Sequence, residues 1–274
     1  MYILAIETTG PRCSVALAGG AGDAGDGGTE REAVCRVLGE EISLRPMGHL
    51  QDLIPLTGRL LDRLHVAKSD ISHIAVSAGP GSFTGIRIGV STARALGQAL
   101  GLPVIAVPTL DGFCRKDVEA AFAAAAPSMQ GAEPVVCGMI NARRGQVYGM
   151  IDGFLPGCPC MLTDVLEIIC SAEGPVRSAG RPVLFFGDGI DAYEKKILDI
   201  LGGAGMTLGK EYFFAPEAFR YQDAASAGRL AFERIQAGEG GTWKDVHPDY
   251  MRKAEAEQKL EAGELPICRL PKQE

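Results

Sequence analysis

The stretch that decides the fold is Gly79-Pro80-Gly81-Ser82-Phe83-Thr84-Gly85-Ile86-Arg87-Ile88-Gly89. A short apolar run at residues 74–78 precedes it, and the segment that follows is expected to be helical up to Leu100. A strand, a glycine-rich turn and a helix in this order can direct backbone N–H groups at an anion. The same order also lets a helix pack closely against a sheet. The first interpretation predicts an enzyme and the second a protein that binds a partner.

Small residues recur at every fourth position of this helix. Gly85, Gly89, Ala93 and Gly97 form one stripe with almost no side chain. A glycine inside a helix costs about 1 kcal/mol relative to alanine, so three of them need a compensating close contact with a sheet or another helix. The stretch is not a P-loop, because no Gly-Lys-Ser/Thr follows, and its spacing differs from the dinucleotide fingerprint. The stripe therefore indicates close packing, and a Gly89→Leu exchange is expected to block it.

A second helix is expected at residues 49–64, with apolar residues on more than one of its faces. Leu56 and Leu60 stand on one face. The residues that recur on the other face are Leu50, Leu53, Ile54, Thr57, Leu61 and Leu64. Two helices with this much small and apolar surface favour a protein–protein interface, and burial inside a large domain is the alternative. The candidate interface residues are His49, Leu53, Leu56, Leu60, Gly85, Arg87, Ile88, Gly89, Ala93 and Gly97.

The composition is that of an ordinary globular protein. The chain has 274 residues, of which 46% are apolar and 22% charged, and its formal net charge is -7. This length suits one large domain or two modest ones, and the acidic balance argues against nucleic-acid binding by the chain alone. No apolar run reaches the ~18 residues that span a bilayer. The eight cysteines lack the spacing of a disulfide framework, so we expect thiols in a reducing cytoplasm, with a metal role for Cys158 and Cys160 as the lesser alternative.

The order of the expected elements predicts an α/β fold with an internal duplication. The first half is expected to have strands at residues 3–8, 13–18, 32–38, 71–77 and 104–107. After a helix at 110–126 and a linker at 127–134, a second series is expected, with strands at 135–141, 146–152 and 183–186 and helices at 192–201 and 224–237. We expect an N-terminal domain over residues 1–108 and a second domain over 109–274, and the last helix could return to pack on the first.

Fragments of a phosphate-binding site are present at the end of the first expected strand. Actin-like and sugar-kinase-like ATPases place an Asp-x-Gly-Thr turn where this chain has residues 7–10. Phosphoryl transfer needs a second phosphate loop and a metal carboxylate in register, and residues 187–189 offer only part of such a loop. The four histidines are too scattered to form a recognisable ligand pair. The candidate cofactor-binding residues are Glu7, Thr8, Thr9, Gly79 and Gly81.

Several of these segments resemble the TsaB family, the bacterial accessory proteins of tRNA threonylcarbamoyladenosine biosynthesis. The segments are residues 3–9, 49–55, 79–89 and 103–107, with weaker agreement at 141–148, 187–189 and 248–252. The resemblance implies a duplicated actin-like, ribonuclease H-like fold of two domains, with mixed sheets flanked by helices. It also implies a non-catalytic, cytoplasmic subunit that binds and activates the transferase TsaD, which modifies adenosine 37 in tRNAs that read codons beginning with A.

The resemblance carries further expectations about partners and cofactors. The ATPase TsaE would be a second partner, ATP and metal would be bound by the partner proteins, and tRNA would be contacted only through the complex. The interface with TsaD would be formed by the two helices at 49–64 and 85–100, and the chain alone would form a homodimer through the same surface.

The chain departs from the related sequences at several positions, and these departures bear on which functions stay open. TsaD holds its metal through a His-x-x-x-His pair, and the matching positions here are Thr109 and Phe113, which cannot replace two imidazoles. Asn141 and Gln146 stand where the TsaB family usually has Asp and Glu. Two other functions stay open: a residual ATP-binding, kinase-like enzyme that uses the turn at residues 7–9, and a metalloprotease, which Thr109 and Phe113 disfavour.

Overall fold

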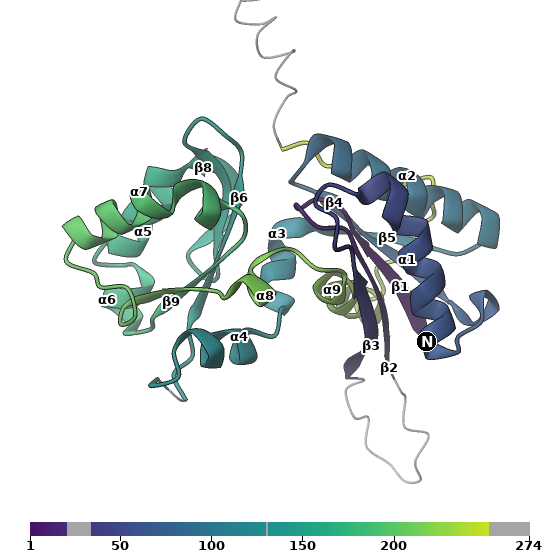
Figure 1. Ribbon diagram of the computed structural model, residues 1–274, viewed down its shortest axis with the longest axis horizontal. Coiled ribbons are helices and arrows are strands. Elements are labelled where there is room, and N and C mark those ends of the chain that lie inside the picture. The colour runs from purple at the N-terminus through teal and green to yellow at the C-terminus, as the bar shows by residue number, and fades with distance from the viewer. Residues whose placement is uncertain (21–33, 130, 252–274) are drawn as a thin grey trace, which may run out of the picture.

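The computed structural model describes residues 1–20, 34–129 and 131–251, which form two halves, each built on a five-stranded sheet (Figure 1). The first sheet has the order β3-β2-β1-β4-β5, and the second has the order β10-β9-β6-β7-β8. The strands of the first sheet are β1 (Tyr2–Glu7), β2 (Ser14–Gly20), β3 (Cys35–Ile42), β4 (His73–Gly79) and β5 (Val104–Pro108). Those of the second are β6 (Val135–Asn141), β7 (Gln146–Ile151), β8 (Leu155–Met161), β9 (Val183–Phe186) and β10 (Tyr212–Phe214).

The two sheets share one topology. In each, three consecutive strands form an antiparallel meander, and two later strands are added in parallel beside the first strand of the meander. Strand β6 thus corresponds to β1, and β9 and β10 correspond to β4 and β5. This repetition confirms the expected duplicated, two-domain α/β fold with mixed sheets flanked by helices.

Helices cover both faces of the first sheet. On one face α1 (His49–Leu64) and α2 (Phe83–Leu100) bury apolar side chains against β1, β2 and β4. On the other face lies α9 (Ala224–Gln236), whose alanine-rich surface packs on the same strands. The last helix therefore returns to the first sheet across the whole second half, so the first half includes a segment far beyond residue 108.

The second sheet is also covered on both faces. One face packs against α5 (Leu162–Cys170) and α7 (Gly189–Gly203), and the short α6 (Pro175–Ala179) lies beside α5. The other face packs against α3 (Thr109–Gly112), a 3-10 turn (Phe113–Arg115) and α4 (Val118–Ala125). The single helix expected at 110–126 is thus broken into short pieces, because the Asp117 side chain accepts a hydrogen bond from Ala120 N and starts a new helix there.

Some elements differ from expectation. Strand β8 was not expected, because Pro156, Gly157 and Pro159 disfavour a strand, and it lies at the edge of its sheet, where prolines are tolerated. Helices α5, α6 and α8 (Glu217–Arg220) and strand β10 were also not expected. The third strand runs from Cys35 to Ile42 instead of 32–38, and residues 32 and 33 lie outside the described part.

Candidate functional site

The glycine stripe of α2 faces the chain's own first sheet. A Cβ atom on Gly85 would lie 2.0 Å from the Thr8 carbonyl oxygen, and one on Gly89 would lie 2.3 Å from Thr8 Oγ1. Near the other end of the helix, a Cβ atom on Gly97 would lie 2.4 Å from Val104 Cγ2. Ala93, Gly85, Gly89 and Gly97 are all buried. This corrects the expectation that the stripe meets a partner: its packing partner is the sheet, and Gly89→Leu would disturb the fold itself.

The glycine-rich turn before α2 is packed on both sides. Gly79 has a φ of +132°, and a side chain there would meet the Asp249 carbonyl oxygen at 2.2 Å. On the other side, Ser82 N donates to Thr9 O at 2.8 Å, and the Ser82 hydroxyl caps the helix by accepting from Gly85 N. The turn therefore joins the end of β1 to a C-terminal segment that follows α9.

The residues expected to bind a cofactor fall into two places. Glu7 is buried, accepts a hydrogen bond from the Thr9 hydroxyl at 2.6 Å, and has its pKa raised by burial. It lines a cavity of about 10 Å³, which has room for roughly one water molecule. The Thr8 hydroxyl donates a hydrogen bond to the Gly85 carbonyl oxygen at 2.8 Å. Only Thr9 and Gly81 line the larger cleft described next.

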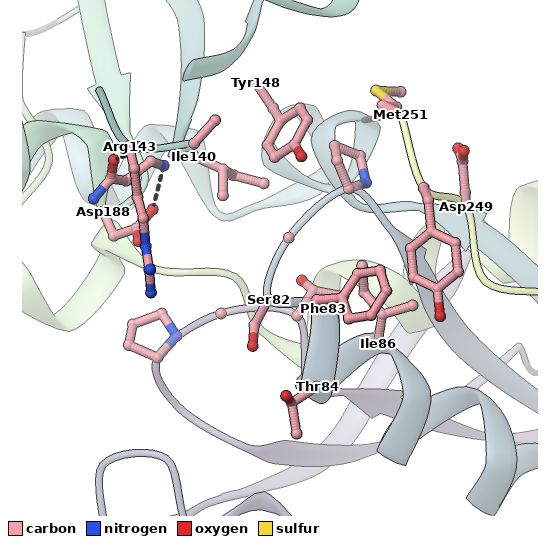
Figure 2. A pocket seen from close by; sticks show the side chains of 18 of the residues that line it. Ser82, Phe83, Thr84, Ile86, Ile140, Arg143, Tyr148, Asp188, Asp249 and Met251 are labelled. Atoms are coloured by element: carbon pink, nitrogen blue, oxygen red, sulfur yellow. Dashed lines mark hydrogen bonds between the residues drawn. The ribbon is translucent and has the colours of Figure 1, made fainter. Parts of the chain in front are cut away.

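A cleft of about 600 Å³ lies between the two halves (Figure 2). The turn after β1 contributes Thr9, and the corresponding turn after β6 contributes Arg143 from the other side. Ser82 and Phe83 at the start of α2 form a third wall. The remaining lining residues include Tyr148, Asp188, Asp249, Tyr250 and Met251. The duplicated halves therefore present matching turns to one cavity, as sequence reasoning on each half alone could not show.

The turn at residues 141–145 is held in an unusual backbone conformation. Arg143 and Arg144 have φ values of 65° and 53°, in the left-handed region that non-glycine residues rarely adopt. Asn141 Oδ1 stabilises the turn, because it accepts hydrogen bonds from Arg143 N at 2.8 Å and from the Tyr193 hydroxyl at 3.1 Å. The Asn141 side-chain oxygen is an acceptor that a carboxylate would supply equally well.

The C-terminal segment supplies a cluster that the sequence did not reveal. The Arg87 guanidinium lies 4.0 Å from the centre of the Phe83 ring, and Arg87 Nε donates to the Tyr250 hydroxyl at 2.8 Å. The Tyr250 ring stacks on Phe83 with centroids 4.5 Å apart. Asp249 N donates to Ala78 O at 2.7 Å, which fixes the segment to the end of β4. Arg87, which was expected to contact a partner, therefore contacts Phe83 and Tyr250 of its own chain.

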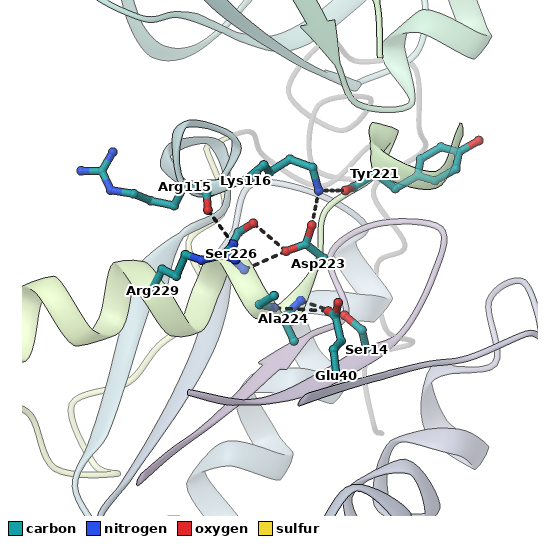
Figure 3. A network of polar contacts seen from close by, with 10 residues as sticks. Ser14, Glu40, Arg115, Lys116, Tyr221, Asp223, Ala224, Ser226 and Arg229 are labelled. Atoms are coloured by element: carbon teal, nitrogen blue, oxygen red, sulfur yellow. Dashed lines mark hydrogen bonds and ion pairs between the residues drawn. The ribbon is translucent and has the colours of Figure 1, made fainter. Parts of the chain in front are cut away.

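A polar junction holds the start of α9 where the chain crosses between the halves (Figure 3). The Lys116 side chain is only 4% exposed, and its ammonium donates to Tyr221 O and pairs with the Asp223 carboxylate. Burial opposes the charge on Asp223, but Lys116 and the hydrogen bonds from Ser226 outweigh it and lower the pKa of Asp223. Burial and the nearby Asp223 raise the pKa of Glu40, which accepts a hydrogen bond from Ala225 N, to about 7.

The outward face of α1 and α2 carries exposed apolar side chains. Leu50 is 76% exposed and Ile54 is 54% exposed, and both lie on α1. On α2, Ile88 is partly exposed. The predicted interface residues of α1 lie on the opposite face and are buried in the core: His49, Leu53, Leu56 and Leu60. The predicted division of α1 into two apolar faces was wrong, because Leu53, which was grouped with Leu50 and Ile54, lies in the core beside Leu56 and Leu60.

Thr109 and Phe113, the positions at which the resemblance implied a comparison with the TsaD metal ligands, are buried. Thr109 has no hydrogen-bond partner for its hydroxyl among the described residues, and the Phe113 ring stacks on Phe186 with centroids 6.1 Å apart. Within residues 1–20, 34–129 and 131–251, no three His, Cys, Asp or Glu side chains are grouped so that they could hold a metal ion. In the same part of the chain, no helix is long and apolar enough to cross a membrane.

Comparisons with known proteins agree with this architecture. The sequence pattern of the family "TsaD: tRNA N6-adenosine threonylcarbamoyltransferase" matches residues 45–155. The tRNA threonylcarbamoyladenosine biosynthesis protein TsaB of Bacillus subtilis is 32% identical over 94% of this chain and 97% of its own length. TsaB of Escherichia coli is 34% identical over 54% of this chain and 53% of its own length.

A solved structure agrees over nearly the same range. YeaZ from Pseudomonas aeruginosa superposes with a TM-score of 0.59 at 27% identity, covering 91% of this chain and 99% of that protein. Since the Bacillus subtilis protein matches almost from end to end, the chain belongs to the TsaB family of tRNA threonylcarbamoyladenosine biosynthesis proteins.

Proposed function

We propose that the chain is a non-catalytic subunit that binds a TsaD-like transferase and activates it for threonylcarbamoylation of adenosine 37 in tRNAs that read codons beginning with A. In this proposal the complex works in the cytoplasm, a TsaE-like ATPase is the further partner, and tRNA is contacted only through the complex. Membership of the TsaB family supports the pathway. The proposal adds the role of activator to it.

The observation that carries the proposal is the outward face of α1 and α2. The two helices are neighbours on one face of the first sheet (Figure 1). The α1 side chains Leu50 and Ile54 leave apolar surface exposed to solvent. Exposed apolar side chains that gather on one face are typical of protein–protein contacts. We propose that a TsaD-like protein covers this face and that, without it, a second copy of the chain does so in a symmetric dimer.

The experiment that tests the proposal is a reconstituted modification assay. A TsaD-like transferase, a TsaE-like ATPase, tRNA and the threonylcarbamoyl donor are incubated with and without the chain, and the modified nucleoside is measured by mass spectrometry. The proposal predicts that modification depends on adding the chain. Equal modification in its absence would refute the activator role, and modification by the chain without the transferase would refute the non-catalytic role.

A second candidate function is nucleotide binding in the cleft. Its volume of about 600 Å³ is within the range of small-molecule sites, and Thr9 and Gly81 line it. Against phosphoryl transfer stands Glu7, which is buried away from this cavity beside a space of about 10 Å³. Calorimetric titration of the chain alone with Mg-ATP distinguishes the candidates: tight binding would favour the nucleotide site, and no heat of binding would remove it.

A further inference from the structure

A small cavity lies where the chain crosses between the two halves. Its volume is about 10 Å³, which is the space that one water molecule takes up. Thr109, the first residue of α3 after β5, lines it from the crossing that leads to the second half, and Gln222, just before α9, lines it from the crossing that leads back. Glu7 at the end of β1 contributes a further wall. Three segments that are far apart in the sequence therefore meet around one space.

Two buried side chains of this cavity carry polar atoms that the rest of the described chain does not satisfy. Thr109 is 3% exposed and Gln222 is 7% exposed. Within residues 1–20, 34–129 and 131–251, the Thr109 hydroxyl and both ends of the Gln222 amide have no hydrogen-bond partner. Nearly all buried polar groups in folded proteins have a partner, which is either another protein group or an ordered water molecule. The cavity therefore has the polar walls of a binding site.

The Gln222 amide is packed against the turn that follows β1. A Cβ atom on Gly10 would lie 2.6 Å from Gln222 Oε1, so a larger residue at that position would displace the amide. Lys116 and Asp223 in the same wall are already paired with each other (Figure 3). These two charged groups have their partners within the protein, whereas the hydrogen bonds of the Gln222 amide remain to be made.

We propose that this cavity binds one water molecule, which forms hydrogen bonds with the Thr109 hydroxyl and the Gln222 amide and so links the two crossings. A water molecule donates two hydrogen bonds and accepts two, so it can serve a hydroxyl group and either end of an amide. Buried waters typically make about three hydrogen bonds, and the Glu7 carboxyl group in the same wall is the third polar partner. The water would thereby hold the outgoing and the returning chain together at the junction of the two halves.

The walls favour a neutral occupant over an ion. The Lys116 ammonium group lines the cavity and repels a second positive charge. Ca²⁺ and Mg²⁺ take six or more oxygen ligands, and the described residues contain no group of three His, Cys, Asp or Glu side chains that could hold a metal ion. A phosphate or a hydrated ion is larger than the space of one water molecule.

The test combines a high-resolution crystal structure of the full chain with urea unfolding of Thr109→Val, Gln222→Met and the double variant. Both exchanges keep the approximate shape of the side chain and remove its hydrogen-bonding group, and Thr109→Ser is the control that keeps the hydroxyl. We expect one water at hydrogen-bonding distance from the hydroxyl and the amide in the wild type and in Thr109→Ser. Each single variant should lower the urea concentration of half-unfolding, and the double variant should lower it by less than the two single shifts together, because one water serves both groups.

Three outcomes would overturn the proposal. The first is a wild-type crystal structure in which Thr109 and Gln222 bond directly to protein groups with no water between them, and this result decides the matter even if a variant does not fold. The second is a pair of single shifts that add up exactly in the double variant. The third is a wild-type stability that changes when sodium chloride is replaced by potassium or choline chloride and that loses this dependence in Gln222→Met, because the occupant is then a cation.

Discussion

The approach of α2 to the first sheet can be tested at Gly85. In Gly85→Ala the new methyl carbon would lie 2.0 Å from the Thr8 carbonyl oxygen, well inside the 3.4 Å at which ordinary contact begins. The obstacle is backbone at the end of β1, so it cannot rotate away as a flexible side chain can. Overpacking of this kind typically costs about 1–3 kcal/mol, and alanine returns at most about 1 kcal/mol of helix propensity. We expect a net loss of up to about 2 kcal/mol in the free energy of unfolding.

The assay is urea unfolding followed by circular dichroism, with Gly58→Ala as the matched control. Gly58 is an exposed interior residue of α1, and a methyl group added there would have nothing within 4 Å. The control should therefore gain up to about 1 kcal/mol from helix propensity alone. If Gly85→Ala gains as much stability as Gly58→Ala does, the close packing of α2 on β1 is refuted.

Three further perturbations test the polar junction and the C-terminal segment. Lys116→Met leaves the partly buried Asp223 carboxylate without its cation. We expect a loss of up to about 3 kcal/mol in urea unfolding, the lower end of the cost of breaking a fully buried pair; a loss too small to measure would contradict the pairing. The raised pKa of Glu40 means that the folded state holds a proton that the unfolded state releases, so stability should fall as pH rises from about 4.5 to about 7. Glu40→Gln should remove this fall in stability with rising pH. If the pH dependence of stability is the same in the variant, Glu40 is not the group that causes it. Tyr250→Ala should speed amide exchange in the first turns of α2, whereas Tyr250→Phe, which keeps the stack on Phe83, should not; equal effects would rule out the stack as the anchor.

Elements with a regular local pattern could be predicted from the sequence. The helix expected at residues 49–64 is α1, because its apolar periodicity and its length belong to the segment itself. Strands β6 and β9 match their expected ranges for the same reason. Strand β8 could not be predicted, because its prolines are tolerated only through its position at the sheet edge, which is a property of the whole fold.

The orientation of the helices could not be predicted in the same way. A stripe of small residues on a helix indicates that another element packs closely against it. The sequence does not specify whether that element is a sheet of the same chain or part of another protein. The cleft could not be predicted from local sequence either, because Arg143 and Tyr250 line it from segments that lie far apart in the chain. Contacts of this kind follow from the topology of both halves, not from local periodicity.

We propose that the outward face of α1 and α2, and not the glycine stripe, binds the partner. The most direct measurement is calorimetric titration of a TsaD-like transferase with the wild type, Ile54→Asp and Leu208→Asp. Ile54 is 54% exposed on α1, and the control Leu208 is 45% exposed in the second half, so neither change should alter the fold. A buried unpaired carboxylate at an interface costs at least about 1.4 kcal/mol, a tenfold change in affinity. We predict that Ile54→Asp weakens binding tenfold or more while Leu208→Asp binds like the wild type; equal affinity of all three proteins would contradict the account.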